Sequence, residues 1–340
     1  DLVPNVLAGV ENIDMSTTVM GKKIGMPLFL SPTALQRLFH WQGERAVAAV
    51  AERFNTWFGI SSLATVSIEE VGAAIKTPKM FQLYIHKDKG LNHAMVEACK
   101  AAKFDAIALT VDTIVSGNRE RCMQTGFTSP PRLTPSSALD FALHPRWTLN
   151  YLLREKFELS NLKNHVREGS DKAISIQDYF NTMLDTSMDW STAAKVRADW
   201  GGQFCLKGIM SVQDAKRAVD IGATAIMVSN HGGRQLDGAQ PSARALPRLH
   251  RALKGQVPLI LDSGIRRGVD ILKARALGAS AVAIGRAALF GAACGGEAGV
   301  LRALDILTDE LRLAMKLAGT PRIEGVDHDL LAPDTVPDTL

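Results

Sequence analysis

The residue types best suited to acid–base chemistry in this chain follow short apolar segments. His231 comes just after one such segment, within the sequence SNHGGRQLD, and Asp112 ends another. An imidazole beside a carboxylate can act as a general base, because the carboxylate stabilises the imidazolium that forms. Each residue also has a structural interpretation, since a histidine after a strand often serves as a hydrogen-bonding group and an aspartate there often caps a helix or turn.

Two arginines and a lysine could complete such a site. Arg234 follows His231 within the same segment, and Arg119 follows Asp112 along the chain. A guanidinium holds a carboxylate in a fork that lysine cannot supply, so both arginines are candidates to bind an acidic substrate. Lys207 stands inside an otherwise apolar segment, where it could simply reach solvent, form a Schiff base, or place positive charge beside a flavin ring.

Further polar residues recur at the ends of successive apolar segments. Gln82 and Tyr84 are two positions apart, as are Thr110 and Asp112, so each pair would face one side of a strand. Glycines after the last two segments would expose backbone N–H groups to a phosphate, with an arginine nearby, although they could equally be turn glycines; these residues are Gly264, Gly285 and Arg286. Independent accidents would not align so many polar groups at one end of successive strands.

Apolar runs that alternate with amphipathic stretches dominate the chain. We predict strands at residues 26–31, 57–62, 80–85, 106–112, 203–209, 225–230, 258–264 and 281–286, and Ser67 with Glu70 predicts a capping box at the start of a helix. A doubly wound sheet would also alternate strands and helices. Eight such units with polar C-terminal ends favour an α/β fold of the closed (β/α)8 type, the TIM barrel, as a single domain over residues 1–340.

One interval interrupts the alternation. Residues 113–190 form a long excursion between the fourth strand and the helix predicted at 191–200, and a gap of this length is typical of a functional segment. It contains HPRWTLNYLLREKFELSNLK, residues 144–163, where large apolar and basic side chains mix. This stretch could pack on the barrel as an amphipathic helix, close over the barrel mouth as a lid, or contact a membrane surface through residues 127–165.

Composition and charge exclude several classes of protein. The chain has 340 residues, 46% hydrophobic and 22% charged, and its net charge of +4 is too small and dispersed to indicate nucleic-acid binding. The four cysteines lie far apart, which argues against a metal site or a disulfide framework and favours a reducing, cytoplasmic compartment. No apolar run reaches the roughly 18 to 20 residues that span a bilayer. The chain opens with DLVPN and no signal-peptide pattern, so we expect that its first residues are missing.

Several of these segments resemble one enzyme family. The motif SNHGGRQLD, followed by LILDSGIRRGVDILKARALGASAVAIGRA, strongly resembles the FMN-dependent L-2-hydroxy-acid oxidases and dehydrogenases, which include glycolate oxidase, the flavin domain of flavocytochrome b2, L-lactate dehydrogenase and mandelate dehydrogenase. Further similar segments are NIDMSTTVMGKKIGMPLFLSPTA, SSLATVSIEE, FQLYIHKD, LTVDT and GNRER. The resemblance covers nearly the whole chain and implies oxidation of a small L-2-hydroxy acid to the 2-oxo acid, with FMN as cofactor.

The resemblance also implies a role for each matching position. The catalytic residues would be His231 as the base, Asp112 as its partner, Tyr84 as an active-site phenol and Lys207 beside the flavin N1 region, with Arg119 and Arg234 as the clamp for the substrate carboxylate. The flavin ring would be lined by Pro32, Thr33, Ala34, Ser61, Gln82, Thr110 and Ser229. The ribityl chain and phosphate would be held by Asp262, Gly264, Arg266, Gly285 and Arg286.

The resemblance gives conflicting indications about the electron acceptor. The sequence HPRW resembles the membrane-associated lactate and mandelate dehydrogenases, which implies a quinone or cytochrome as acceptor and a peripheral position on the inner face of the cell membrane. Ala34 stands instead where those enzymes have glycine and oxidases commonly have alanine, so an oxygen-using oxidase that makes hydrogen peroxide is the alternative. Leu63 replaces a tryptophan of glycolate oxidase, which disfavours a plain glycolate oxidase.

Three further expectations concern the molecule as a whole. Relatives carry an N-terminal helical segment with a second active-site tyrosine, and we expect this chain to begin after it, which leaves the activity of this fragment open. Relatives are often tetramers, so we expect a homo-oligomer by analogy. More distant alternatives are a Schiff-base aldolase built on Lys207 and a catalytically inactive barrel that binds or scaffolds other molecules.

Overall fold

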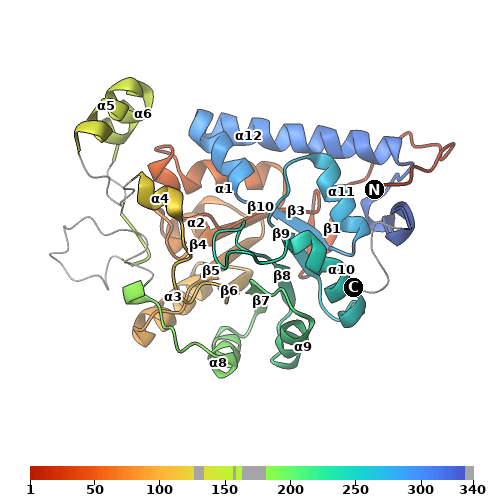
Figure 1. Cartoon of the computed structure of the whole chain (residues 1–340), viewed down its shortest axis with the longest axis horizontal. Helices are drawn as coiled ribbons and strands as arrows, with labels where there is room; N and C mark the ends of the chain where they lie inside the picture. The colour runs from red at the N-terminus through yellow and green to blue at the C-terminus, as the bar shows by residue number, and fades with distance from the viewer. Residues whose placement is uncertain (126–133, 156–157, 163–180, 334–340) are drawn as a thin grey trace.

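The computed structural model describes residues 1–125, 134–155, 158–162 and 181–333. Its centre is a closed barrel of eight parallel strands in the spatial order β10-β3-β4-β5-β6-β7-β8-β9 (Figure 1). The strands are β3 (Leu28–Leu30), β4 (Trp57–Ser61), β5 (Lys79–Leu83), β6 (Ala106–Thr110), β7 (Gln203–Lys207), β8 (Ala225–Val228), β9 (Leu259–Asp262) and β10 (Ala281–Ile284). Each coincides with a predicted strand, so the prediction of a TIM barrel is confirmed.

The barrel strands are apolar along their whole length because both of their faces are buried. Successive side chains of a strand point to opposite sides. One set fills the barrel interior and includes Phe29, Trp57 and Ile260, with the rings of Phe29 and Trp57 stacked at a centroid distance of 5.4 Å. The other set, which includes Phe58 and Phe81, belongs to the larger apolar cluster between strands and helices. The strand ends are thereby held in a rigid ring.

A helix follows each strand on the outside of the barrel (Figure 1). These helices are α1 (Glu44–Arg53), α2 (Ile68–Ala74), α3 (Lys89–Ala101), α8 (Trp190–Trp200), α9 (Val212–Asp220), α10 (Ser242–Leu253), α11 (Gly268–Ala276) and α12 (Arg286–Leu317). Ser67 caps α2 as predicted, and its hydroxyl accepts a hydrogen bond from the Glu70 N–H at 3.1 Å. The predicted capping box does not form, because the Glu70 carboxylate pairs with Arg45.

The long excursion after the fourth barrel strand is confirmed, since residues between β6 and α8 form elements outside the barrel. They include α4 (Glu120–Gln124), α5 (Pro135–Leu143) and α6 (Pro145–Leu153). In Figure 1, α5 and α6 lie side by side at one end of the molecule, away from the barrel axis. Within the amphipathic stretch at 144–163, helix α6 ends at Leu153, since Arg154 adopts extended backbone angles. Residues 126–133, 156–157 and 163–180 of the excursion lie outside the described residues.

Two shorter structures complete the barrel ends. The antiparallel pair β1 (Thr17–Val19) and β2 (Lys22–Ile24) precedes the first barrel strand, and its residues Val19 and Ile24 are buried against the inner cluster. Between β3 and α1, the 3-10 helix η1 (Gln36–Leu38) follows the segment 32–34. Two more 3-10 turns, η2 (Ile323–Gly325) and η3 (His328–Leu330), follow α12.

Helix α12 is the one helix in the described part of the chain that is long and apolar enough to cross a membrane by length and composition alone, although the sequence showed no unbroken apolar run. Its backbone departs from helical angles at Gly295 and Gly296. Its buried residues, among them Val300 and Leu304, belong to the same apolar cluster as the other barrel helices, and α12 packs on α1 and α11. Helix α12 therefore serves as the eighth outer helix of the barrel.

Candidate active site

His231 and Asp112 meet at the carboxyl ends of β8 and β6. The Nδ1 atom of His231 lies 3.2 and 3.3 Å from the two carboxylate oxygens of Asp112. When Nδ1 donates its proton to this carboxylate, the neutral imidazole carries its lone pair on Nε2, which can then accept a proton. His231 adopts a left-handed backbone with φ of 57°, and its N–H donates to the Ser229 hydroxyl at 3.0 Å. Histidine visits this region more readily than most residues, and the turn aims its ring back toward β6.

The surroundings of this pair keep it in the protonation state that a general base needs. Burial lowers the pKa of His231 below its ordinary value of 6.5, and the positive charge of Lys207 adds to the effect, while Asp112 opposes it. Burial alone would raise the pKa of Asp112, but the hydrogen bond from His231 and the charge of Lys207 outweigh it, so this pKa lies below 3.8. At neutral pH a neutral imidazole therefore faces an ionised carboxylate.

Lys207, Ser229 and Asp262 form a buried polar network at the ends of β7, β8 and β9. The Ser229 hydroxyl accepts a hydrogen bond from Lys207 Nζ at 3.2 Å and donates one to Asp262 Oδ2 at 2.6 Å. Lys207 Nζ lies 3.3 Å from the same carboxylate oxygen, and the Ser31 hydroxyl donates to Asp262 Oδ1 at 2.9 Å. The network holds the ammonium group among buried partners.

The charge state of Lys207 follows from its partners. Burial lowers its pKa, but the carboxylates of Asp262 and Asp112 outweigh burial, and the net result is a pKa above the ordinary 10.5. A Schiff-base lysine must instead be an unprotonated amine that attacks a carbonyl. This environment therefore disfavours the aldolase alternative and suits a permanent positive charge.

Tyr84 lies where the charged candidates converge. Burial raises the pKa of Tyr84 to about 12, and the phenol feels the charges of Lys207, Asp112, Arg119 and Arg234. The phenol is therefore protonated at neutral pH and can donate a hydrogen bond. Burial lowers the pKa of Arg119, and the positive charge of Arg234 lowers it further.

Two buried polar atoms at the ends of β5 and β6 indicate whether the site could hold a flavin. Gln82 Nε2 and Thr110 Oγ1 are buried and make no hydrogen bond to the described residues. The carbonyl oxygen of the Gln82 side chain accepts from the Ser61 hydroxyl at 2.9 Å, so its NH2 group faces away from this partner. Buried polar groups without partners are costly. The carbonyl and ring-nitrogen edge of a flavin would satisfy both atoms, so the residues present fit FMN.

The segment after β3 forms a further wall of this end of the barrel. Pro32, Thr33 and Ala34 are half-buried, and the Thr33 hydroxyl accepts a hydrogen bond from Gln36 Nε2 at 2.8 Å. Pro32 lies directly against β4, because a Cβ atom at Gly59 would come within 2.8 Å of Pro32 Cδ. The three predicted residues are thus held close to the ends of β3 and β4.

The ends of β9 and β10 provide groups suited to a phosphate. Gly285 is the N-cap of α12 and makes no side-chain cap, so backbone N–H groups of the first turn can face an anion. Gly264 is exposed with φ of 85°, and the exposed Arg286 donates to the Gly232 carbonyl at 2.9 Å. Arg266 is also exposed, and its backbone N–H binds Asp270 at 3.0 Å, so its side chain is not fixed within this group by the contacts of the described residues.

Sequence reasoning missed three residues that hold this site together. Thr113 is buried, and its hydroxyl donates to Asp112 Oδ1 at 3.0 Å and lies 3.4 Å from His231 Nδ1. Ser31 binds Asp262, as described above, and Gln235 binds Arg119 Nη2 at 3.0 Å. Each of them adjoins a residue that was predicted, and adjacency within the motifs is the signal that could have found them.

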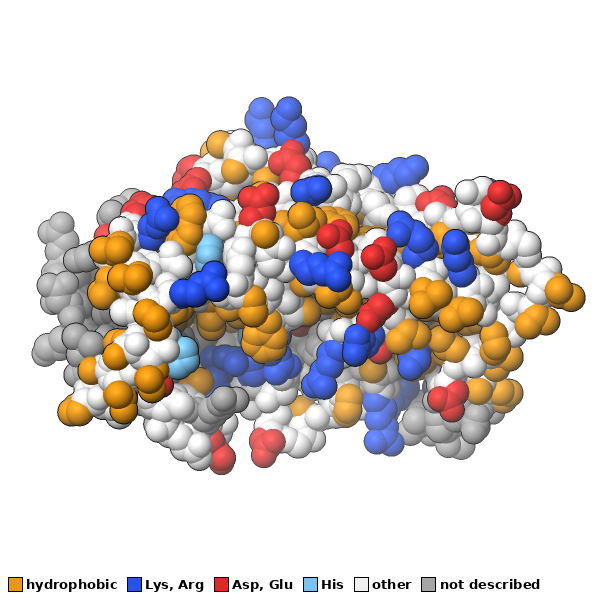
Figure 2. Space-filling view, turned by 90° about the horizontal axis from the view of Figure 1, so that it is seen from above, with side chains coloured by type: hydrophobic (Ala, Val, Ile, Leu, Met, Phe, Trp, Pro, Cys, Tyr) orange, Lys and Arg blue, Asp and Glu red, His pale blue; other side chains and the backbone are white. Residues whose placement is uncertain are grey.

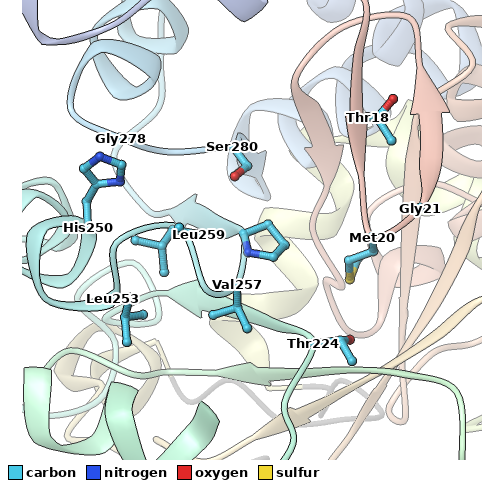
Figure 3. A pocket seen from close by; sticks show the side chains of 12 residues that line it. Thr18, Met20, Gly21, Thr224, His250, Leu253, Val257, Leu259, Gly278 and Ser280 are labelled. Carbon is cyan, nitrogen blue, oxygen red and sulfur yellow. The ribbon is translucent and has the colours of Figure 1, made fainter.

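A separate pocket of about 380 Å³ lies at the opposite, N-terminal end of the barrel (Figure 3). Its lining includes Thr18 and Met20 from the β1–β2 hairpin and His250 from α10, together with residues that precede or open β8, β9 and β10. In Figure 3, the side chains of Met20 and His250 stand on opposite sides of this pocket. It contains none of the predicted site residues, and in barrels of this type this end usually serves stability.

Fold and site together define a class of protein. Candidate catalytic groups at the carboxyl ends of the strands, beside buried polar atoms that lack a hydrogen-bond partner, suit a β/α-barrel oxidoreductase that holds a flavin at this end. The comparison with protein families specifies the class. The model of the FMN-dependent dehydrogenase family matches residues 1–333, and this chain belongs to that family. It is therefore an FMN-dependent oxidoreductase that acts on 2-hydroxy acids, as the sequence predicted.

Similar proteins come from both branches of the family. L-lactate dehydrogenase of Yersinia pestis is 38% identical over 331 residues, covering 96% of this chain and 86% of that protein. The crystal structure of the monotopic membrane protein (S)-mandelate dehydrogenase matches with a TM-score of 0.92 and 32% identity, over 98% of this chain and 88% of that one. Lactate oxidase of Pediococcus acidilactici matches with a TM-score of 0.81 and 33% identity, over 96% and 80% of the two chains.

Proposed function

We propose that this chain is an L-lactate- or L-mandelate-type dehydrogenase in which His231 is the catalytic base. The observation that carries the proposal is the contact between His231 Nδ1 and the carboxylate of Asp112 at 3.2 Å, at the barrel end where Gln82 and Thr110 present buried polar atoms to a flavin. This contact turns an ordinary imidazole into an oriented base whose protonated form is stabilised.

The reaction removes two electrons and two protons from the substrate and converts its C2–OH group to C2=O. FMN, when bound, would accept the two electrons and one of the two protons, and the other proton would go to the protein. His231 takes one substrate proton on Nε2, and Asp112 stabilises the imidazolium that results. Arg119 and Arg234 hold the substrate carboxylate, and the protonated phenol of Tyr84 donates a hydrogen bond to a substrate oxygen.

The proposed cofactor contacts follow the strand ends around the barrel. Lys207, held as an ammonium by Asp262, would lie beside the flavin N1 region and favour the anionic reduced ring. The ring would be lined by Pro32, Thr33, Ala34, Ser61, Gln82, Thr110 and Ser229. The ribityl chain and phosphate would be held by Asp262, Gly264, Gly285 and Arg286, with Arg266 able to join them from the surface.

We propose a quinone or cytochrome rather than oxygen as the electron acceptor. Support comes from the sequence HPRW at the start of α6 and from the similarity to L-lactate dehydrogenase and (S)-mandelate dehydrogenase. Ala34 and the similarity to lactate oxidase support the oxidase alternative. The test supplies substrate to the FMN-loaded protein in air and measures quinone-analogue reduction and hydrogen peroxide in parallel. We expect quinone reduction to dominate, whereas peroxide formed at the rate of substrate turnover would contradict the proposal.

We propose further that the α5–α6 hairpin contacts a membrane surface. None of the residues of α5 or α6 is buried, and five leucines are largely exposed: Leu139 63%, Leu143 67%, Leu149 54%, Leu152 68% and Leu153 76%. Figure 2 shows hydrophobic side chains gathered at the end of the molecule where this hairpin lies, with basic side chains nearby. Exposed apolar groups flanked by Arg146 and Arg154 suit the boundary of an anionic bilayer.

The membrane proposal is tested by sedimentation with vesicles that contain phosphatidylglycerol. A Leu152→Asp, Leu153→Asp double variant should lose most of its vesicle binding, because two charges would enter the apolar boundary. The matched control is Leu317→Asp at the end of α12, where the leucine is equally exposed at 69% but lies on another element. Equal binding by the double variant and the wild-type protein would overturn the proposal.

Two proposals remain for the molecule as a whole. We propose that residues 1–340 act as one functional domain, since every candidate site residue comes from the same barrel. We also propose a homo-oligomer, with a tetramer expected by analogy, and the exposed apolar residues Phe290 and Leu313 of α12 offer surface for such contacts. Light scattering after size-exclusion chromatography tests this, and a monomer at micromolar concentration would contradict it.

A further inference from the structure

Two loops carry four of the residues that form the proposed site for substrate binding and proton transfer. The loop after β6 contains Asp112 and Arg119, and the loop after β8 contains His231 and Arg234. The loops touch at Gly117, where a Cβ atom would come within 2.3 Å of the Arg234 carbonyl oxygen and 2.8 Å of the next Cα atom. Only glycine allows this approach, so the relative position of the two loops is set by close backbone contact.

Gln235 connects the same two loops through its side chain. Its Oε1 atom accepts a hydrogen bond from Arg119 Nη2 at 3.0 Å. Its Nε2 atom donates to the carbonyl oxygen of Asp112 at 3.2 Å and to that of Val115 at 3.1 Å. One amide thus reaches the guanidinium of the proposed clamp and the backbone of the residue that orients the base.

The chemistry of these partners fixes the orientation of the amide and explains why the residue is a glutamine. A guanidinium has only donors and a carbonyl has only acceptors, so the oxygen must face Arg119 and the NH2 group must face the two carbonyls. A glutamate could accept from Arg119 but would repel both carbonyl oxygens and neutralise the charge that the substrate needs. A leucine of similar size would satisfy neither side.

We infer that Gln235 is a positioning residue that locks Arg119 and the Asp112 loop into one arrangement with His231. It holds the guanidinium of Arg119 without cancelling its charge, and it anchors the segment 112–115 by two backbone contacts. This inference rests on the proposed role of Arg119 in binding the substrate carboxylate. It assigns to the motif SNHGGRQLD a function for the glutamine that follows the arginine.

The test compares Gln235→Leu, Gln235→Glu and Arg119→Met in the FMN-loaded protein. The probe is pyruvate or benzoylformate, whichever is the product of the substrate that reduces the wild-type protein faster, and its Kd is read from the change in flavin absorbance. For Gln235→Leu we expect Kd and KM to rise at least about tenfold, the size of a lost hydrogen bond to a charged group, and kcat to fall by less. Gln235→Glu should weaken binding further, because its carboxylate competes for Arg119.

Controls separate positioning from general destabilisation and from failure of the clamp. Leu236→Ala, at a neighbouring residue that is 76% exposed, should leave Kd and KM unchanged. FMN content should match the wild type in the Gln235→Glu variant, which keeps the size of the side chain. If Arg119→Met weakens binding and both Gln235 variants bind normally, the inference is wrong while the clamp stands. If Arg119→Met also binds normally, the proposed clamp itself is wrong and the inference falls with it.

Discussion

The proposed base, His231, lies between groups that change its pKa in opposite directions. Burial and Lys207 lower the pKa of His231, and Asp112 raises it. A base must be unprotonated to accept a proton, so activity should fall as pH drops through this lowered pKa, at a pH below 6.5. The two neighbours thus set the acid limit of the reaction from opposite sides.

This balance predicts opposite shifts in two variants. In Asp112→Asn the carboxylate that raises the pKa of His231 is lost. The acid limb of the pH profile of kcat/KM should therefore move to lower pH while the maximal rate falls. In Lys207→Met the positive charge that lowers the pKa of His231 is lost, so the acid limb should move to higher pH. Steady-state kinetics between about pH 4.5 and 8, a range that spans the ordinary histidine pKa, measures both. Limbs that move in the same direction in both variants would exclude this account of His231.

The assignment of the base has its own test. His231→Ala should retain FMN, because the proposed cofactor contacts come from other residues. It should lose at least about a hundredfold in the rate of flavin reduction, which is typical of removing a general base. Stopped-flow absorbance under anaerobic conditions measures this rate. A variant that reduces its flavin at nearly the wild-type rate would refute the assignment.

Several residues of the candidate site could be predicted because their types are rare at strand ends. His231, Asp112, Lys207 and the arginine that follows His231 stood out in this way, and the structure brings them together. Thr113, Ser31 and Gln235 did not stand out by residue type, since threonine, serine and glutamine are common in loops, and only their adjacency to predicted residues marks them. Their importance depends on loops more than 100 residues apart in the chain meeting in space, as Gln235 does with Asp112.

At the scale of elements, strand β4 packs closely against the segment that follows β3. A Cβ atom at Gly59 would lie 2.8 Å from Pro32 Cδ and 3.0 Å from the Leu30 carbonyl oxygen. Such overpacking typically costs about 1–3 kcal/mol. The segment 32–34 would have to shift, and this segment is proposed to line the flavin.

Gly59→Ala should therefore weaken FMN binding by at least about fivefold, the equivalent of about 1 kcal/mol. Titration of the apoprotein with FMN, followed by quenching of flavin fluorescence, gives the Kd. Gly325→Ala is the matched control, because a Cβ atom there meets nothing within 4 Å. An FMN affinity that is unchanged in Gly59→Ala would show that this segment does not line the cofactor.

The sequence predicted element types better than element lengths. Every barrel strand was located because a strand buried on both faces is apolar throughout, a signal that needs no partner to be recognised. The amphipathic stretch from His144 was harder to bound, because leucine and arginine favour helix beyond the point where the backbone turns at Arg154. The Ser67 cap was predicted correctly. The Glu70 carboxylate instead pairs with Arg45 of another helix, a contact that local sequence does not reveal.

At the scale of the whole molecule, the closed ring of strands explains why candidate site residues that are far apart in the chain lie at the same end of the barrel. Tyr84 after β5, Asp112 after β6, Lys207 on β7 and His231 after β8 come from four neighbouring strands. Closure could be predicted from the number of strand–helix units and the polar residues at one end. The position of the α5–α6 hairpin could not, because no periodic pattern in the excursion specifies where it leaves the barrel.

The central claim is that these groups converge on one flavin and one small acid, and anaerobic mixing tests it most directly. The FMN-loaded protein is mixed without oxygen with the L and D forms of lactate and mandelate and with glycolate, and flavin absorbance is followed. The account predicts bleaching by at least one L-hydroxy acid and none by its D enantiomer, since one base and two arginines select one enantiomer of the substrate. A flavin that stays oxidised with every L-hydroxy acid, or that is reduced equally by both enantiomers, would contradict the account.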